Sequence, residues 1–287
     1  MNTIQEGVKI YLAGDCTEIN RVWINRGTVP AIGLSEESYE TGALVPALNW
    51  RKPDSAELKI LMQNDAEPDY NMTVGVIRLP EGLIDQLNEF GISGFDSVLE
   101  LSEHIEKNPV AFNRIREGFR DVIGKHSYIE NGFVIHDILI NSGNRLSTTI
   151  NLNTNQFTGL HIDFWDQLSL GKIDDARNRI SFNLSKSVRY FVFVNLTISQ
   201  ILEKLSHETD IKGFNQERVL KEFLKRNPEY PVVKVKVEPF EGYIAPTENL
   251  IHDGSTLGSS GKDIQLFTRG YFSITKLSDS FSLTNEQ

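Results

Sequence analysis

The stretch that decides our interpretation of this chain is Thr158-Gly-Leu-His-Ile-Asp-Phe-Trp-Asp166. If residues 157–163 are extended, side chains two positions apart project from the same face of the strand. His161 and Asp163 then lie on one face, and Ile162 points to the other. The stretch therefore predicts that one imidazole and one carboxylate converge near the end of a strand.

A second, distant stretch carries the candidate for a third ligand. It reads Glu241-Gly-Tyr-Ile-Ala-Pro-Thr-Glu-Asn-Leu-Ile-His-Asp-Gly254 and contains His252. Two histidines and one carboxylate on one face of an octahedron leave three positions open on a ferrous ion. We therefore predict a metal centre at His161, Asp163 and His252. Hydrogen-bonded core histidines are the alternative interpretation of the two imidazoles.

The chain contains its own control for the His-x-Asp spacing. His104 and Glu106 have the same separation, but Val98, Leu101 and Ile105 around them recur at helical spacing. Two positions on a helix that are two residues apart point in well-separated directions. This second pair is therefore not expected to chelate one ion.

Composition limits the classes of partner. The 287 residues are 39% hydrophobic and 24% charged, which is typical of a soluble globular protein. Acidic residues outnumber basic ones, the formal charge is −10, and there is no basic block. These features argue against nucleic acid and against anionic membranes as partners, and they favour a small-molecule substrate. The pattern does not indicate an oligomeric state.

The single cysteine and the N-terminal residues indicate a cellular location. Cys16 has no second cysteine with which to form an intramolecular disulfide. Residues 1–7 show no basic segment followed by a long apolar one, and no apolar run approaches the length of a membrane span. We therefore expect a cytoplasmic protein.

Hydrophobic periodicity predicts one mainly β domain of the α+β type with three parts. Residues 1–130 contain short strands at 7–12 and 20–25 and then three support helices, one of which begins at Pro109. Residues 131–276 change to alternating or continuous apolar segments, with a helical insert at about 199–227. Residues 277–287 form a polar tail that we expect to be loose. The expected core strands cover 133–140, 147–152, 157–163, 179–184, 189–198, 232–237, 242–244, 249–252 and 263–274.

The order of these features resembles that of the iron(II)/2-oxoglutarate-dependent dioxygenases. His-x-Asp is followed by strands, a helical insert, Glu241 and Gly242 ahead of Pro246 and His252, and an arginine in the last strand. The resemblance covers roughly residues 130–276. It implies a double-stranded β-helix, also called a jelly-roll or cupin-like fold. It also implies Fe(II) as the metal, with 2-oxoglutarate and O2 as cosubstrates.

The resemblance further implies a hydroxylase that forms succinate and carbon dioxide. Its substrate would be a small molecule, an amino acid or a specialised metabolite. Because Asp163 supplies a carboxylate, hydroxylation is favoured over chlorination, while desaturation and ring formation stay open. A basic residue beyond the distal histidine would bind the remote carboxylate of 2-oxoglutarate. Arg269 and Lys262 are the two candidates, and alternation places them on opposite faces of one strand.

We favour Arg269, because an isolated charge in an apolar strand needs a buried partner and a guanidinium matches a carboxylate with two parallel hydrogen bonds. Asn183 and Arg189 are further candidates for contact with the acid or the substrate. The alternative for Arg189, and for Arg179, is a salt bridge to Asp174 or Asp175. The aromatic residues beside the predicted ligands are expected to shape a substrate pocket, or else to belong to the core; they are Phe164, Trp165 and Tyr243.

Two other classes of function remain open at this stage. The same ligands could hold zinc or manganese in a cupin-like hydrolase or isomerase, because ligand type alone does not determine the metal. The fold could also serve as a non-catalytic binding module. The strand with Arg269 is the discriminating feature, because a non-oxidative enzyme has no need of a residue that binds 2-oxoglutarate.

Overall fold

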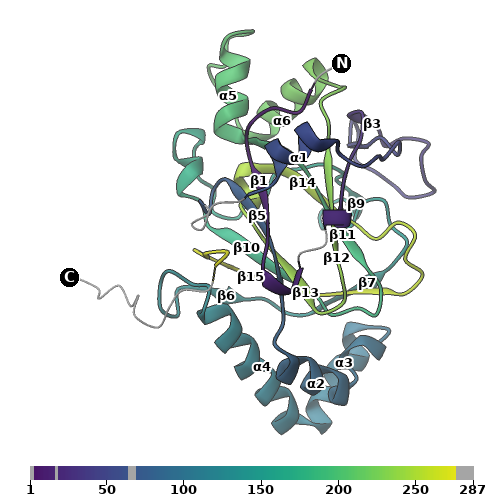
Figure 1. The fold of residues 1–287 in the computed structure, drawn as a ribbon. Coiled ribbons are helices and arrows are strands. Elements are labelled where there is room, and N and C mark those ends of the chain that lie inside the picture. The colour runs from purple at the N-terminus through teal and green to yellow at the C-terminus, as the bar shows by residue number, and fades with distance from the viewer. Residues whose placement is uncertain (1–2, 17–18, 64–68, 276–287) are drawn as a thin grey trace.

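The structure of the protein is a computed structural model, and it describes residues 3–16, 19–63 and 69–275. Its centre consists of two facing sheets in which nearly all neighbouring strands are antiparallel (Figure 1). The predicted tail, 277–287, lies outside the described residues.

The larger sheet has seven strands and the smaller sheet has four. In the larger sheet the order is β1 (Lys9–Leu12), β5 (Thr73–Arg78), β13 (Glu241–Ala245), β10 (Asn178–Asn183), β15 (Lys262–Gly270) and β6 (Val134–Ile135), and β7 (Leu139–Ser142) also pairs with β15. In the smaller sheet the order is β14 (Leu250–Ser255), β11 (Arg189–Thr197), β12 (Val233–Val237) and β2 (Val22–Ile24). Two short hairpin-like pairs accompany them: β3 (Thr28–Pro30) with β4 (Leu44–Pro46), and β8 (Ile150–Asn151) with β9 (Gln156–Phe157).

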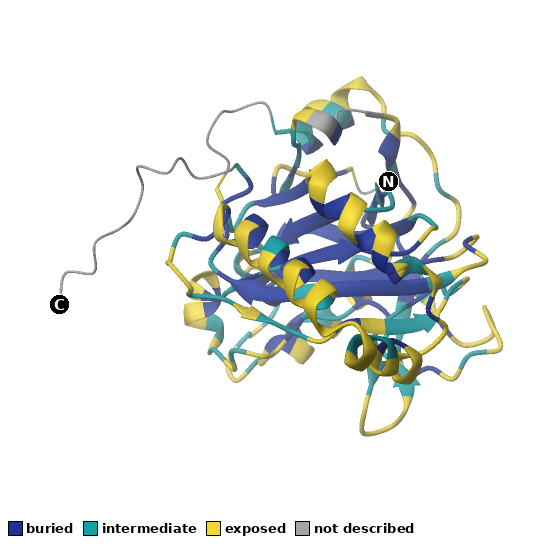
Figure 2. Ribbon diagram, turned by 90° about the horizontal axis from the view of Figure 1, so that it is seen from below, coloured by how far each residue is buried: buried dark blue, intermediate teal, exposed yellow. Residues whose placement is uncertain are grey.

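Helices cover the outer faces of both sheets. The larger sheet is covered by α2 (Glu81–Phe90), α3 (Val98–Lys107) and α4 (Pro109–Gly124), and the smaller sheet by α5 (Ile198–Ser206) and α6 (Gln216–Arg226). A short helix, α1 (Ser55–Leu61), packs near β1. Figure 2 shows exposed residues on the outer sides of the helices and buried strands behind them. Among the described residues, no helix combines the length and the apolar character that a membrane span requires.

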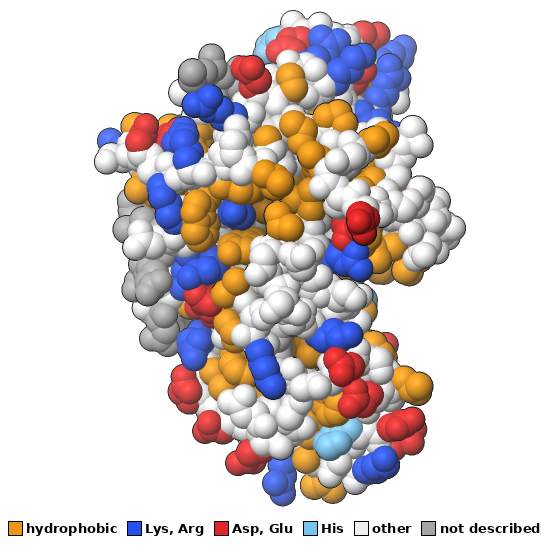
Figure 3. All heavy atoms as spheres, turned by 90° about the vertical axis from the view of Figure 1, so that its right-hand side faces the viewer, with side chains coloured by type: hydrophobic (Ala, Val, Ile, Leu, Met, Phe, Trp, Pro, Cys, Tyr) orange, Lys and Arg blue, Asp and Glu red, His pale blue; other side chains and the backbone are white. Residues whose placement is uncertain are grey.

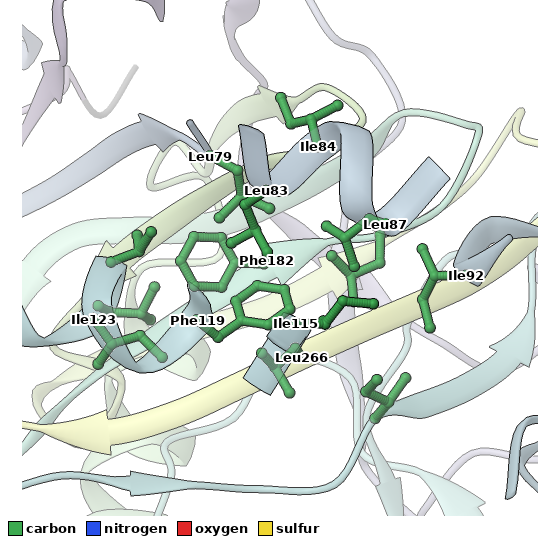
Figure 4. Packing of buried hydrophobic residues seen from close by; sticks show 14 of the residues in the cluster. Leu79, Leu83, Ile84, Leu87, Ile92, Ile115, Phe119, Ile123, Phe182 and Leu266 are labelled. Atoms are coloured by element: carbon green, nitrogen blue, oxygen red, sulfur yellow. The ribbon is translucent and has the colours of Figure 1, made fainter. Parts of the chain in front are cut away.

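The two faces of strand β10 carry different kinds of side chain. Ile180 and Phe182 pack with the helices in one hydrophobic cluster (Figure 4). Arg179 and Ser181 alternate with them and face the space between the sheets, where Ser181 hydrogen-bonds to Gln265 of β15. The outer face of the strand is therefore apolar and its inner face is polar.

The expectation of antiparallel sheets with supporting helices is confirmed at this level. The N-terminal part does more than provide a helical support layer, because β1 and β5 extend the larger sheet and β2 extends the smaller one. Two expected strands are shorter than the pattern suggested. The segment 133–140 is divided between β6 and β7, and the segment 157–163 contains only the end of β9 and one isolated bridge at His161.

A matched pair of leucines tests the packing of the helices on the larger sheet. Leu87 of α2 is fully buried, whereas Leu99 of α3 is 70% exposed. Leu87→Ala should lower the free energy of unfolding by about 2–5 kcal/mol, because it removes core contacts and leaves a cavity. Leu99→Ala should change it by less than about 0.5 kcal/mol. Equilibrium denaturant unfolding measures both, and equal losses would contradict the described packing.

Candidate metal centre

His161 and His252 face each other across a two-residue antiparallel bridge. The backbone N–H of His161 donates to the carbonyl of His252 at 2.9 Å, and the N–H of His252 donates to the carbonyl of His161 at 2.8 Å. The bridge places residue 161 beside β14, at the edge of the smaller sheet. The centroids of the two imidazole rings are 4.5 Å apart.

Asp163 completes the group from the same chain segment as His161. Its backbone N–H donates to the carbonyl of Thr247 at 3.1 Å. One carboxylate oxygen, Oδ1, lies 3.7 Å from Nε2 of His161, and the other, Oδ2, lies 3.8 Å from Nε2 of His252. One ligand atom from each residue can be chosen so that all three lie within 4.8 Å of one another. This buried group could therefore hold a metal ion.

The hydrogen bonds of the two imidazoles fit a metal-binding role. Nδ1 of His161 lies 2.9 Å from the carbonyl of Gly159, and Nδ1 of His252 lies 3.0 Å from the carbonyl of Leu250. A carbonyl only accepts, so each Nδ1 carries the proton and each Nε2 keeps its lone pair. Both lone-pair atoms belong to the group around Asp163, and a backbone partner at the second nitrogen is the usual support for a metal-bound histidine.

Gly159 provides the turn that aims His161. Its φ is +67°, in the left-handed region that glycine adopts without strain. A Cβ atom at this position would lie 2.4 Å from the carbonyl oxygen of Leu44. The regular strand therefore ends before His161. The glycine two residues ahead of the histidine is the sequence signal for this geometry.

Protonation differs across the ligand group. Burial alone would lower the pKa of His161, but Asp163 and Asp253 raise it, so a metal ion would compete with a proton at its Nε2. Burial, together with the nearby imidazole of His161, lowers the pKa of His252 to about 3. Burial alone would raise the pKa of Asp163, but Arg179 and the two histidines hold it well below its usual range. The carboxylate is therefore ionised, and the His252 ring is neutral.

The salt-bridge partner that the sequence suggested for Arg179 is wrong. Its Nη2 lies 2.9 Å from Oδ2 of Asp163, so its salt bridge is not to Asp174 or Asp175. The side chain of Asp174 instead accepts hydrogen bonds from Ser199 and Asn249. Arg179 faces inward because it alternates with the outward Ile180 on β10. It pairs with Oδ2 of Asp163, the same carboxylate oxygen that lies 3.8 Å from Nε2 of His252.

Arg269 lies at the same end of the larger sheet as Arg179, since the two residues are paired in the β10–β15 register. Its Nη2 is 2.6 Å from Oδ1 of Asp166 and also contacts Glu248. The guanidinium lies over the ring of Trp165 at 5.3 Å. Two carboxylates therefore already neutralise this arginine.

Lys262 lies at the opposite end of β15. It pairs with Ser142 in the register, and its Nζ is 3.7 Å from Asp96 at a partly exposed position. Asn183 is likewise used for structure, because its side-chain amide donates to the carbonyls of Ser187 and Val237. The structure brings neither residue to the ligand group.

Arg189 is buried between the sheets and incompletely paired. Its Nε and Nη1 have no hydrogen-bond partner, and the nearest carboxylate oxygen, Oδ1 of Asp263, is 3.8 Å from Nε. The expected alternative, a bridge to Asp174 or Asp175, is therefore wrong for this residue too. A Cβ at Gly254 would lie 2.8 Å from Nη2 of Arg189, so this glycine makes room for the guanidinium.

Gly254 is two residues beyond His252 on β14, so the two positions share one face of the strand. Arg189 therefore lies further along the inner face that carries the histidine ligand. Between these positions Phe191 of β11 packs 5.5 Å from the ring of His252 and stacks on Tyr243 at 4.2 Å. The side chain of Tyr243 therefore lines the interior between the sheets.

The other two aromatic candidates are at the surface. Phe164 and Trp165 are 54% and 53% exposed, directly after Asp163. The ring of His136 lies 5.9 Å from that of Trp165 and stacks on Phe267 at 4.5 Å. Trp165, His136 and Phe267 form an aromatic group, and together with the exposed Phe164, its neighbour in the chain, we call it the aromatic rim.

Comparison of the chain with protein-family models, with curated proteins and with solved structures finds no match.

Removing single ligands tests the metal centre. His161→Ala, Asp163→Ala and His252→Ala should each weaken Fe(II) binding by well over tenfold, because each loses one bond and the three-ligand geometry. Anaerobic Fe(II) titration measures the affinity, and circular dichroism checks that the variants are folded.

His104→Ala is the matched control for this experiment. His104 belongs to the His-x-Glu pair on α3, where its ring contacts Phe90 at 4.8 Å. This variant should keep the affinity for Fe(II). Full affinity in Asp163→Ala would show that the group is not the metal site.

Proposed function

We propose that the protein is an Fe(II)/2-oxoglutarate-dependent oxygenase that hydroxylates a small molecule in the cytoplasm, with formation of succinate and carbon dioxide. The observation that carries the proposal is a buried arginine with unpaired donors, Arg189, on the interior face that also holds the His161, Asp163 and His252 group. The metal ligands alone do not distinguish this activity from others.

The proposal includes a jelly-roll core, and strand connectivity supports it. Along the chain, the strands pass back and forth between the two sheets. The larger sheet contains β6, β7, β10, β13 and β15, and the smaller sheet contains β11, β12 and β14. The His161 bridge, which precedes β10 in the chain, lies beside the smaller sheet. Eight strands shared in this way between two facing sheets are typical of a jelly roll. The N-terminal strands are additions at the edges of this core.

The ligand set supports iron. Two histidines and one carboxylate with open positions are typical of non-haem Fe(II) oxygenases. When bound, ferrous iron with 2-oxoglutarate and dioxygen would supply the oxidising chemistry, and the chain's task is to hold and orient the groups that react. His161 and His252 would bind through Nε2. Arg179 would keep the carboxylate of Asp163 ionised and in position.

Arg189 is the better candidate for the remote carboxylate of 2-oxoglutarate. A buried guanidinium with free N–H groups carries an energetic penalty that an anion removes. Its planar donors match a carboxylate with two parallel hydrogen bonds. Arg269, which the sequence favoured, already binds Asp166 and Glu248. A hydrolase or isomerase with the same ligands has no need of such an arginine.

The rim of the site suggests how the substrate is bound. Phe164 and Trp165 offer exposed aromatic surface immediately after the ligand Asp163. Asp166 and Glu248 are occupied by Arg269, and Asp166 also binds Arg177. We therefore infer a substrate with an apolar part that lies on the aromatic rings.

Arginine variants test the proposal. Arg189→Met should weaken 2-oxoglutarate binding by about one to two orders of magnitude, because a hydrogen bond to a charged group contributes roughly 1.5–3 kcal/mol. Arg189→Lys should also weaken it, since the planar geometry is lost. Iron affinity should stay within about threefold. The measurement is a 2-oxoglutarate titration at fixed Fe(II), with succinate formation as the activity.

Arg269→Lys and Lys262→Ala are the controls and should change the 2-oxoglutarate requirement much less. If Arg269→Lys raises that requirement and Arg189→Met leaves it unchanged, the carboxylate binds at Arg269. If wild type binds zinc but forms no succinate with any candidate substrate and does not bind 2-oxoglutarate, a non-oxidative metalloenzyme or a binding module is the correct class.

A further inference from the structure

A cavity lies on the outer face of the smaller sheet, away from the metal group. It has a volume of about 150 Å³. Tyr190 and Val192 of β11 line it, and they alternate with the inward-facing Phe191 and Phe193. Its walls include Leu48, Trp50, Leu146, Tyr190, Lys234 and Leu257. The sheet itself therefore separates this cavity from His252.

The only charged side chain among the lining residues is Lys234. Its Nζ lies 4.3 Å from the ring centroid of Trp50, 4.9 Å from that of Tyr190 and 5.1 Å from that of Trp23. No carboxylate of the described residues lies within 4.0 Å of this nitrogen, whereas the neighbouring Lys236 pairs with Glu238 at 2.5 Å. Lys234 therefore presents an ammonium group that only aromatic rings accompany.

The surroundings of this face agree with an apolar site that contains a cation. The side of the molecule on which β11 and β12 are labelled in Figure 1 faces the viewer in Figure 3. Hydrophobic side chains gather across the middle of that face, with lysine or arginine side chains among them (Figure 3). Aromatic faces stabilise an ammonium only in part, and an anion forms the stronger, charge-assisted hydrogen bond.

We propose that this cavity binds a small monocarboxylic acid, whose carboxylate pairs with Nζ of Lys234 and whose apolar body lies against Trp50 and the leucines. The single cation matches a single carboxylate. The volume is below the roughly 300–1,000 Å³ of pockets for drug-sized ligands, so a short-chain or single-ring acid fits better than a nucleotide or a lipid. The site does not involve the metal group, and the inference does not depend on the proposed oxygenase activity.

The binding should have a distinctive dependence on pH. Burial, and secondarily the nearby Lys52, lower the pKa of Lys234 to about 8. The charged groups around it are Lys52, whose Nζ lies 3.5 Å from the ring of Trp23, Lys236 on its own strand, and Glu238 just beyond the end of that strand. Tyr190 also faces it. Only the protonated amine attracts the acid, so affinity is complete well below pH 8 and is lost as the pH rises through 8.

The experiment is a titration of the full chain with benzoate, followed by tryptophan fluorescence, because Trp23 and Trp50 both lie near Lys234. Lys234→Met should weaken binding at least tenfold, since it keeps an apolar side chain of similar length without the charge. Lys236→Met is the matched control and should bind as wild type does. Affinity of the wild type should fall about tenfold between pH 7 and pH 9, whereas an ordinary lysine would keep its charge to about pH 10.

Benzyl alcohol provides the neutral comparison and should bind at least tenfold more weakly than benzoate. Equal binding of the two, unchanged benzoate affinity in Lys234→Met, or no benzoate binding at all would each overturn the inference. The comparison of benzoate with benzyl alcohol needs no variant, so it tests the inference even if Lys234→Met does not fold. Repeating the titration with Asp163→Ala should give the wild-type affinity, which separates this site from the metal centre.

Discussion

The site depends on the backbone bridge between His161 and His252. Its two hydrogen bonds join chain segments that are far apart in sequence, and they set the imidazole centroids 4.5 Å apart with the ring planes tilted by 48°. Asp163 follows from the same segment, because two more residues of extended chain bring its carboxylate to both Nε2 atoms. The carbonyls of Gly159 and Leu250 then fix the tautomers. Local backbone geometry thus determines the whole ligand group.

The interior is organised by charge as well as by packing. Arg179 pairs with the ligand carboxylate, whereas Arg189, further along the inner face, keeps donors without partners. Asp263 lies 3.8 Å from Nε of Arg189 and leaves hydrogen-bond donors free, and these donors are the reason for proposing a carboxylate cosubstrate near the metal group. On the other side of the smaller sheet, Lys234 is a cation that no described carboxylate pairs with. There the walls of the cavity are aromatic and the space is small. One sheet therefore separates the two places at which we propose that carboxylates bind.

Sequence reasoning named the three residues that the structure brings together. Alternation, a local property of the chain, paired His161 with Asp163, whereas the candidate His252 came from a distant stretch. It overestimated the strand at 157–163, because the left-handed turn at Gly159 interrupts it. Arg269 was expected to need a buried partner and has two, but Asp166 and Glu248 are 103 and 21 positions away and no pattern pointed to them. The incomplete hydrogen bonding of Arg189 likewise depends on which side chains the fold places beside it. The same holds for β1, β5 and β2, whose places at the sheet edges depend on long-range pairing.

The most direct test of the central claim is a spectrum of the wild-type protein under anaerobic conditions. Fe(II) alone should leave the visible region almost featureless. If 2-oxoglutarate binds the iron held by the three ligands, its addition should produce a weak visible charge-transfer band that saturates with one equivalent of iron. Absence of the band at saturating Fe(II) and 2-oxoglutarate would contradict the assignment as a 2-oxoglutarate-dependent oxygenase.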